Sequence, residues 1–137
     1  MPDFTEGSAF PKRIGISKKA KRSKEHTLRR LLRDHIWIRD GGRSRASGAI
    51  LQRDHCLLEL RGEVAHVQSR GSCPERKMDP TNCILLSAAE HILSDGRGGY
   101  RLKLFDAETG APALDSTRRI RFVLHRKDGS IEREYVS

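Results

Sequence analysis

Two segments of the sequence place the strongest constraint on the fold, because together they describe a strand, a loop and a helix. The segment V-A-H-V-Q-S-R-G, residues 64–71, predicts the end of a β-strand that runs into a loop, and it carries His66. The segment T-N-C-I-L-L-S-A-A-E-H, residues 81–91, predicts a loop, a turn at Asn82 and a helix that carries His91. A histidine that can take a proton, an amide that can orient it and a second histidine that can hold a metal are suitable parts of a hydrolytic site.

The segment R-D-G-G-R-S-R-A-S-G, residues 39–48, makes this pattern more specific. Taken with His66, Asn82 and His91 in their order and spacing, it resembles the HNH endonuclease family, whose first knuckle usually reads R-D-x-x-x-C-x-x-C-G. The resemblance covers about residues 36–95. It implies an α+β fold with a small ββα-metal unit, to which the flanking sequence patterns add an N-terminal helix and a C-terminal β-hairpin.

Many members of this family hold a structural zinc with two Cys-x-x-Cys pairs, and this chain departs from that pattern. The four matching positions are Ser44, Ser47, Ser87 and Glu90. A serine hydroxyl is a poor zinc ligand at neutral pH, so a tetrahedral thiolate site cannot form there and no structural zinc is expected. The residue before the presumed base is often an Asp, Glu or His that helps to bind the catalytic metal, whereas this chain has Ala65.

The resemblance also implies a role for each residue of the trio. His66 would be the general base that deprotonates water, Asn82 would orient this base and pin the loop, and His91 would bind one divalent metal. The expected metal is Mg²⁺ or Mn²⁺, with Zn²⁺ or Ni²⁺ as alternatives. Asp95 follows His91 by four residues, so both can face one side of a helix, and it is the candidate second ligand. The alternatives are a hydrogen-bonded strand histidine for His66 and an acid at a helix C-terminus for Asp95.

The net charge of +9 is concentrated in one segment. Residues 11–33 hold ten of the 27 Lys and Arg residues but a single acid, Glu25, whereas the remaining 17 basic and 17 acidic residues balance. Such a run neutralises phosphates and gains affinity from counterion release, so DNA is the expected partner. The alternative for the basic run is a solvated, solubilising tail.

Ten basic residues are candidates for contacts with phosphate groups. Those of the basic run are Lys18, Lys19, Lys21, Arg22, Arg29, Arg30 and Arg33. Those of the loop after His66 are Arg70, Arg76 and Lys77. Such contacts position nucleic acid without reading its sequence. For each of the three loop residues, the alternative is a solvated side chain.

The chain is expected to comprise a basic flexible arm, residues 1–23, and an HNH nuclease-like domain, residues 24–137, because the arm has too few apolar residues to order itself. A helix is predicted from near Ser23 to Asp40. Apolar spacing favours one buried face for this helix, formed by Leu28, Leu31, Leu32, His35 and Ile36. Trp37 is expected to pack into the core as well.

The remaining elements are predicted from apolar runs and from glycine and proline. Strands are expected over 56–60 and 63–68, a loop over 69–81 and a helix over 84–93. The C-terminal part is expected to be rich in β-structure, with strands over 100–105, 120–126 and 130–136 and a hairpin turn over 127–130.

The expected function is that of a metal-dependent HNH-type endonuclease that hydrolyses DNA phosphodiester bonds, with nicking of one strand as one form of this activity. The alternative is a catalytically degenerate HNH-like protein that only binds nucleic acid or a partner. No apolar run approaches the ~18 residues that span a membrane, and no secretory signal is expected at the N-terminus. The odd, scattered cysteines Cys56, Cys73 and Cys83 favour free thiols in a reducing cytoplasm.

Overall fold

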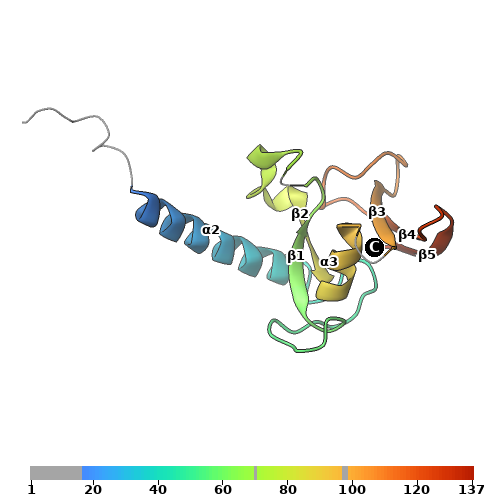
Figure 1. Cartoon of the computed structure of the whole chain (residues 1–137), viewed down its shortest axis with the longest axis horizontal. Helices are drawn as coiled ribbons and strands as arrows, with labels where there is room; N and C mark the ends of the chain where they lie inside the picture. Colours follow the sequence, from blue (N-terminus) through green and yellow to red (C-terminus); the bar gives the residue numbers. More distant parts are fainter. Residues whose placement is uncertain (1–16, 70, 97–98) are drawn as a thin grey trace, which may run out of the picture. The chain divides into compact units, whose positions relative to one another are not determined.

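The computed structural model describes residues 17–69, 71–96 and 99–137, and within them the chain is a mixture of helices and small antiparallel sheets (Figure 1). The elements follow the order α2 (Lys18–Arg39), β1 (Gly62–His66), β2 (Cys83–Ser87), α3 (Ala88–Ser94), β3 (Arg101–Asp106), β4 (Ile120–His125) and β5 (Ile131–Val136). Two short 3₁₀ helices, Pro74–Arg76 and Pro80–Asn82, lie between β1 and β2. None of the helices in the described ranges is long and apolar enough to cross a membrane.

Helix α2 begins at Lys18, earlier than predicted, so residues 18–23 of the expected flexible arm are helical. The Ser17 hydroxyl accepts a hydrogen bond from the Ala20 N–H at 3.1 Å, which satisfies one of the free donors of the first turn. Lys, Arg and Ala have high helix propensity, so this basic segment can be helical without apolar residues. The prediction used apolar spacing and therefore placed the helix start too late. Residues 1–16 of the predicted arm lie outside the described residues.

The buried face of α2 is narrower than predicted, and it lies near the helix C-terminus. Leu28 and Leu31 are 47% and 56% exposed, and His35 is exposed too, so the expectation that they face the core is wrong. The chain divides into two units, residues 1–31 and 32–137. In the second unit, the fully buried Ile36 and the partly buried Trp37 pack with Leu51, Cys83 and Leu85, which confirms the prediction for Trp37.

Strands β1 and β2 form an antiparallel pair in which His66 lies opposite Cys83. All five residues of β2 are buried. The prediction of a helix over 84–93 is therefore wrong for residues 84–87, which belong to β2, and the helix begins only at Ala88. A short apolar run does not distinguish a buried strand from a helix, which explains the error. Helix α3 contacts β1, β2 and β3 (Figure 1), so it lies against both sheets.

The predicted strand over 56–60 is also wrong, because this segment forms turns. The carbonyl of Leu57 accepts from the N–H groups of Leu60 and Arg61 at 3.1 and 3.0 Å, so these backbone groups are satisfied locally. Leu57 and Leu58 are 53% and 38% exposed, and their apolar character therefore does not reflect a sheet face.

The second sheet has the order β3-β4-β5, which confirms the predicted β-rich C-terminal part. The β4–β5 connection contains Gly129 with φ +90°, a conformation that favours glycine in a tight turn. Phe122 and Ile120 of this sheet are fully buried, and they form one core with Ile84 of β2 and Ala65 of β1.

Candidate functional site

His66 is the last residue of β1, and the loop that follows it holds its imidazole ring. The ring nitrogen Nε2 lies 2.8 Å from the carbonyl oxygen of Lys77. A carbonyl oxygen only accepts hydrogen bonds, so Nε2 carries the hydrogen and the lone pair of the neutral ring is on Nδ1. Within the described part of the chain, Nδ1 has no hydrogen-bond partner, so it can accept a proton from a bound molecule.

Asn82 is fully buried and fixes the loop that carries the Lys77 carbonyl. Its Oδ1 accepts from the Gln68 N–H at 2.7 Å, and its Nδ2 donates to the carbonyls of Gln68 and Arg76 at 3.0 and 3.2 Å. Arg76 directly precedes Lys77, so the amide holds the backbone one residue away from the His66 contact. The structure therefore brings His66 and Asn82 together through the loop backbone.

The side chain of Arg76 also stabilises this loop, through hydrogen bonds to three of its residues. Its guanidinium donates to Thr81 Oγ1 at 2.9 Å, to Asp79 Oδ2 at 3.2 Å and to Gln68 Oε1. Hydrogen bonds from Thr81 and then Arg76 hold the pKa of the Asp79 carboxyl below its ordinary 3.8. The contribution of Asp79 to stability is therefore present above that value and lost as the pH falls below it.

Arg39 and Asp40 link the end of α2 to the turn that carries Asn82. The Arg39 guanidinium donates to the carbonyls of Pro80 and Cys83 at 2.9 and 2.7 Å, one on each side of that turn. The Asp40 carboxylate accepts from Arg39 Nε at 2.9 Å and from the Leu85 N–H of β2 at 2.9 Å. Burial at the start of β2 raises the pKa of the Cys83 thiol to about 11, so this residue stays a neutral core thiol.

His91 lies on α3 and faces a carboxylate that sequence reasoning missed. Its Nδ1 is 2.9 Å from Oε1 of Glu63 on β1. A carboxylate accepts this bond, so Nδ1 carries a hydrogen and Nε2 has the lone pair that can bind a metal. A carboxylate behind a histidine is the usual partner of a metal-binding imidazole. Only the strand register could have indicated this contact, because Glu63 pairs with Leu86, close to the start of the helix that carries His91.

Asp95 is the C-cap residue of α3, where its N–H donates to the His91 carbonyl at 3.2 Å. This position follows His91 by one helical turn, as the spacing predicts. Among residues 17–69, 71–96 and 99–137, however, no group of three or more His, Cys, Asp or Glu side chains could hold a metal ion. The assignment of Asp95 as a metal ligand stays a prediction.

The positions that match the zinc ligands of the resembled family meet in a hydrogen-bonded cluster. Glu90 Oε1 accepts from the Ser44 hydroxyl at 2.6 Å and from the Ser87 N–H at 2.9 Å, while Ser87 Oγ accepts from the Glu90 N–H at 3.1 Å. Ser44 Oγ also accepts from the Ser47 N–H at 3.1 Å. The reciprocal pair Ser87 and Glu90 is a capping box, a signal in the sequence S-A-A-E that marks the start of α3.

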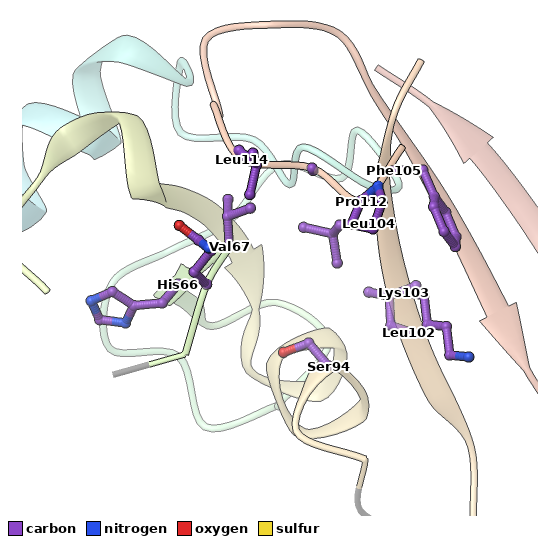
Figure 2. A pocket seen from close by; sticks show the side chains of 11 residues that line it. His66, Val67, Ser94, Leu102, Lys103, Leu104, Phe105, Pro112 and Leu114 are labelled. Atoms are coloured by element: carbon purple, nitrogen blue, oxygen red, sulfur yellow. The ribbon is translucent and has the colours of Figure 1, made fainter. Parts of the chain in front are cut away.

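A hollow of about 470 Å³ opens beside His66, between the end of β1 and the edge strand β3. Figure 2 shows Val67 and Leu114 on one side of this hollow and Leu102 and Leu104 on the other, with the His66 ring turned away from β3. The hollow is therefore largely apolar, and His66 stands at its rim.

The candidate phosphate-contacting residues have different surroundings. The seven candidate residues of the basic run, of which Lys18, Lys19, Lys21 and Arg22 were expected in the flexible arm, are all exposed on α2. Among them, Arg29 pairs with Glu25 at 2.8 Å. Arg76 is engaged within the loop, so it positions the backbone, and Lys77 contributes the carbonyl that holds His66. Arg70 lies outside the described residues. Contacts of these residues with phosphate stay predictions.

The chain was also compared with known proteins. No family model, no curated protein and no solved structure matches it.

Proposed function

We propose that this protein is a metal-dependent endonuclease of the HNH type that hydrolyses phosphodiester bonds in DNA, with β1, β2 and α3 as its ββα-metal unit. The observation that carries the proposal is the orientation of His66. Its Nε2–H donates a hydrogen bond to the Lys77 carbonyl, and Asn82 fixes the loop that carries this carbonyl. The lone pair on Nδ1 is therefore available to accept a proton. An oriented neutral histidine is suited to act as a general base near neutral pH.

The reaction that this base can support is attack of water on a phosphodiester. His66 Nδ1 takes a proton from the water as the water oxygen bonds to phosphorus, and the bond from phosphorus to the leaving sugar oxygen breaks. The leaving oxygen takes up a proton from solvent. Asn82 and Arg76 keep the loop in place during these events, so His66 does not have to be reoriented.

A divalent metal at this site would have few protein ligands, so water and substrate oxygens would complete its coordination shell. His91 has Nε2 free of the Glu63 contact, and Asp95 follows it by one turn, so these two residues would hold the metal. A carboxylate with water and phosphate oxygens suits Mg²⁺ or Mn²⁺, and an imidazole suits Zn²⁺ or Ni²⁺. The metal would stabilise negative charge on the phosphate and on the leaving oxygen.

The small number of candidate metal ligands also favours a second function. If catalysis needs a metal held by three or more side chains, a group that the described residues do not offer, the domain would bind nucleic acid and not cleave it. In that case the His66 and His91 hydrogen bonds would only stabilise the loop and α3. The two functions make opposite predictions for metal-dependent cleavage, so one assay separates them.

The test is nicking of supercoiled plasmid by the full chain in a series of Mg²⁺, Mn²⁺, Zn²⁺ and Ni²⁺, with a chelator as the control. The nuclease proposal predicts open-circular product with at least one metal and none with the chelator. Binding of the plasmid without product under every metal would refute the nuclease and favour the binding protein.

A further inference from the structure

A second hollow, of about 530 Å³, lies on the C-terminal sheet between the start of β3 and the β4–β5 turn. Four of the residues that line it are basic, namely Arg101, Lys103, Arg126 and Lys127, and none is acidic. Tyr100 and His125 line it as well. A concave surface with charges of one sign concentrates the field on a bound ion of the opposite sign.

Three of these four cations have no carboxylate partner among the described residues. Arg126 is paired with Glu132 at 2.7 Å, whereas Arg101, Lys103 and Lys127 form no ion pair with any described residue. By contrast, Arg118 and Arg121, on the same sheet or next to it, are paired with acids. The hollow therefore keeps an excess of positive charge that its own protein surface does not neutralise.

The head group of Arg101 lies against a glycine. A Cβ atom built on Gly96 would lie 3.2 Å from Arg101 Cζ, so the guanidinium packs directly against the Gly96 backbone. Gly96 has φ +78°, which also disfavours any other residue there. A guanidinium placed in this way loses less entropy when it binds a phosphate.

This hollow is separate from the one beside His66. Side chains alternate along a strand, so Arg101 and Lys103 face one side of β3 while Leu102 faces the other side, toward the core. Figure 2 shows the Lys103 amine pointing away from His66, although the residue lines both hollows. A ligand of the basic hollow would thus not contact the His66 ring from there.

We propose that the basic hollow is a second nucleic-acid-binding surface, which holds backbone phosphates outside the cleavage site. The proposal rests on the DNA partner of the proposed function, but it does not depend on hydrolysis. The cations of Arg101, Lys103 and Lys127 can each neutralise one backbone phosphate and release its counterions. DNA would therefore contact this protein at two separate surfaces.

The test compares two triple variants of the full chain that have the same net charge. The hollow variant is Arg101→Gln, Lys103→Gln and Lys127→Gln. The control variant is Arg43→Gln, Arg119→Gln and Arg133→Gln, which replaces three exposed cations outside the hollow. The probe is a duplex oligonucleotide, and the readout is the slope of log affinity against log salt. The hollow variant should lose about 0.9 in slope for each lost phosphate contact, up to about 2.7, while the control keeps the wild-type slope.

Each other outcome has a defined meaning. Equal slopes for the two triple variants, or failure of the wild-type protein to bind DNA, would overturn the second surface. Displacement of the duplex by inorganic phosphate, at an ionic strength matched with chloride, would identify a small-anion site instead. At saturating DNA the double variant Arg101→Gln and Lys127→Gln, which keeps Lys103 and so the hollow beside His66, should nick at the wild-type rate, and loss of nicking there would assign the basic hollow to the cleavage site. Absence of nicking in the wild-type protein refutes the nuclease alone, because the binding comparison does not use it.

Discussion

Asn82 is completely buried, yet its amide makes three hydrogen bonds to the backbone of one loop. That Asn82 pins a loop near His66 was implied by the resemblance to the HNH endonuclease family. The partner of His91 was not predictable in this way, because Glu63 lies 28 residues away and reaches it only through the register of β1 with β2. The same holds for Arg39, whose guanidinium contacts the carbonyl of Cys83 from 44 residues away.

Replacing Asn82 by alanine should leave the His66 ring without a fixed orientation, with a smaller effect on DNA binding. The change leaves the N–H and the carbonyl of Gln68 without their partners, and each such loss costs about 1–3 kcal/mol of unfolding free energy. The Arg76 carbonyl keeps its hydrogen bond from the Asp79 N–H. Chemical denaturation measures this loss, and nitrogen NMR reports the tautomer of His66. We expect Nε2–H in the wild-type protein and a mixture of tautomers in Asn82→Ala. An unchanged tautomer in the variant would show that Asn82 does not position the ring.

Replacing Glu63 by alanine should weaken metal binding through His91. Loss of a carboxylate partner typically lowers metal affinity by about 10–100-fold, because the imidazole loses its orientation and part of its basicity. Calorimetric titration with Mn²⁺ measures this effect without reference to activity. The matched control is Glu59→Ala, an exposed acid in the preceding turn. Equal Mn²⁺ affinity in the two variants would remove the His91 imidazole from the metal site.

At the scale of the elements, helix α3 shows both what the sequence predicts and where it is ambiguous. The apolar run Cys83–Leu86 is equally compatible with a strand and with a helix, and only burial on both faces of β2 decides between them. The capping box of Ser87 and Glu90 was a signal for the start of α3 that the prediction of a helix over 84–93 missed. The turns over 56–60 had no comparable signal, because their leucines suggested a sheet face that the fold does not form.

The cluster around Glu90 should stabilise the domain without a metal. Glu90→Ala removes the acceptor of the Ser44 hydroxyl and half of the capping box, and we expect the unfolding free energy to fall by about 1–3 kcal/mol. Glu108→Ala is the control, since an exposed ion pair such as Glu108 with Arg118 contributes about 0–1 kcal/mol. A chelator should leave the thermal unfolding of the wild-type protein unchanged. A large decrease in Tm on chelation would reveal a structural metal.

At the scale of the whole molecule, the sequence predicts where the charge lies only in part. The basic run over 11–33 is visible in the sequence, whereas the remaining charges balance and indicate nothing. The fold nevertheless gathers Arg101, Lys103 and Lys127 into one hollow and pairs several other arginines with acids. Net charge by segment does not predict this arrangement, because it depends on which cations share a sheet face.

Deleting residues 1–24 should weaken DNA binding without removing the cleavage site. The deletion takes away seven basic residues, among them Lys18 and Arg22, whereas His66 and His91 lie far beyond it in the sequence. The slope of log affinity against log salt should fall by about 0.9 per lost phosphate contact, and the loss should be similar for all DNA sequences. An unchanged slope would make the basic run a solubilising segment.

The central claim is that His66 is the base of a hydrolytic site, and His66→Ala tests it most directly. The measurement is the single-turnover nicking rate at saturating plasmid, together with the Kd for the same DNA. His35→Ala, which replaces an exposed histidine on α2, is the control. We expect the rate of His66→Ala to fall by about 10²–10⁴-fold, with a Kd close to that of the wild-type protein and no rate change in His35→Ala. A rate near that of the wild-type protein in His66→Ala would contradict the account.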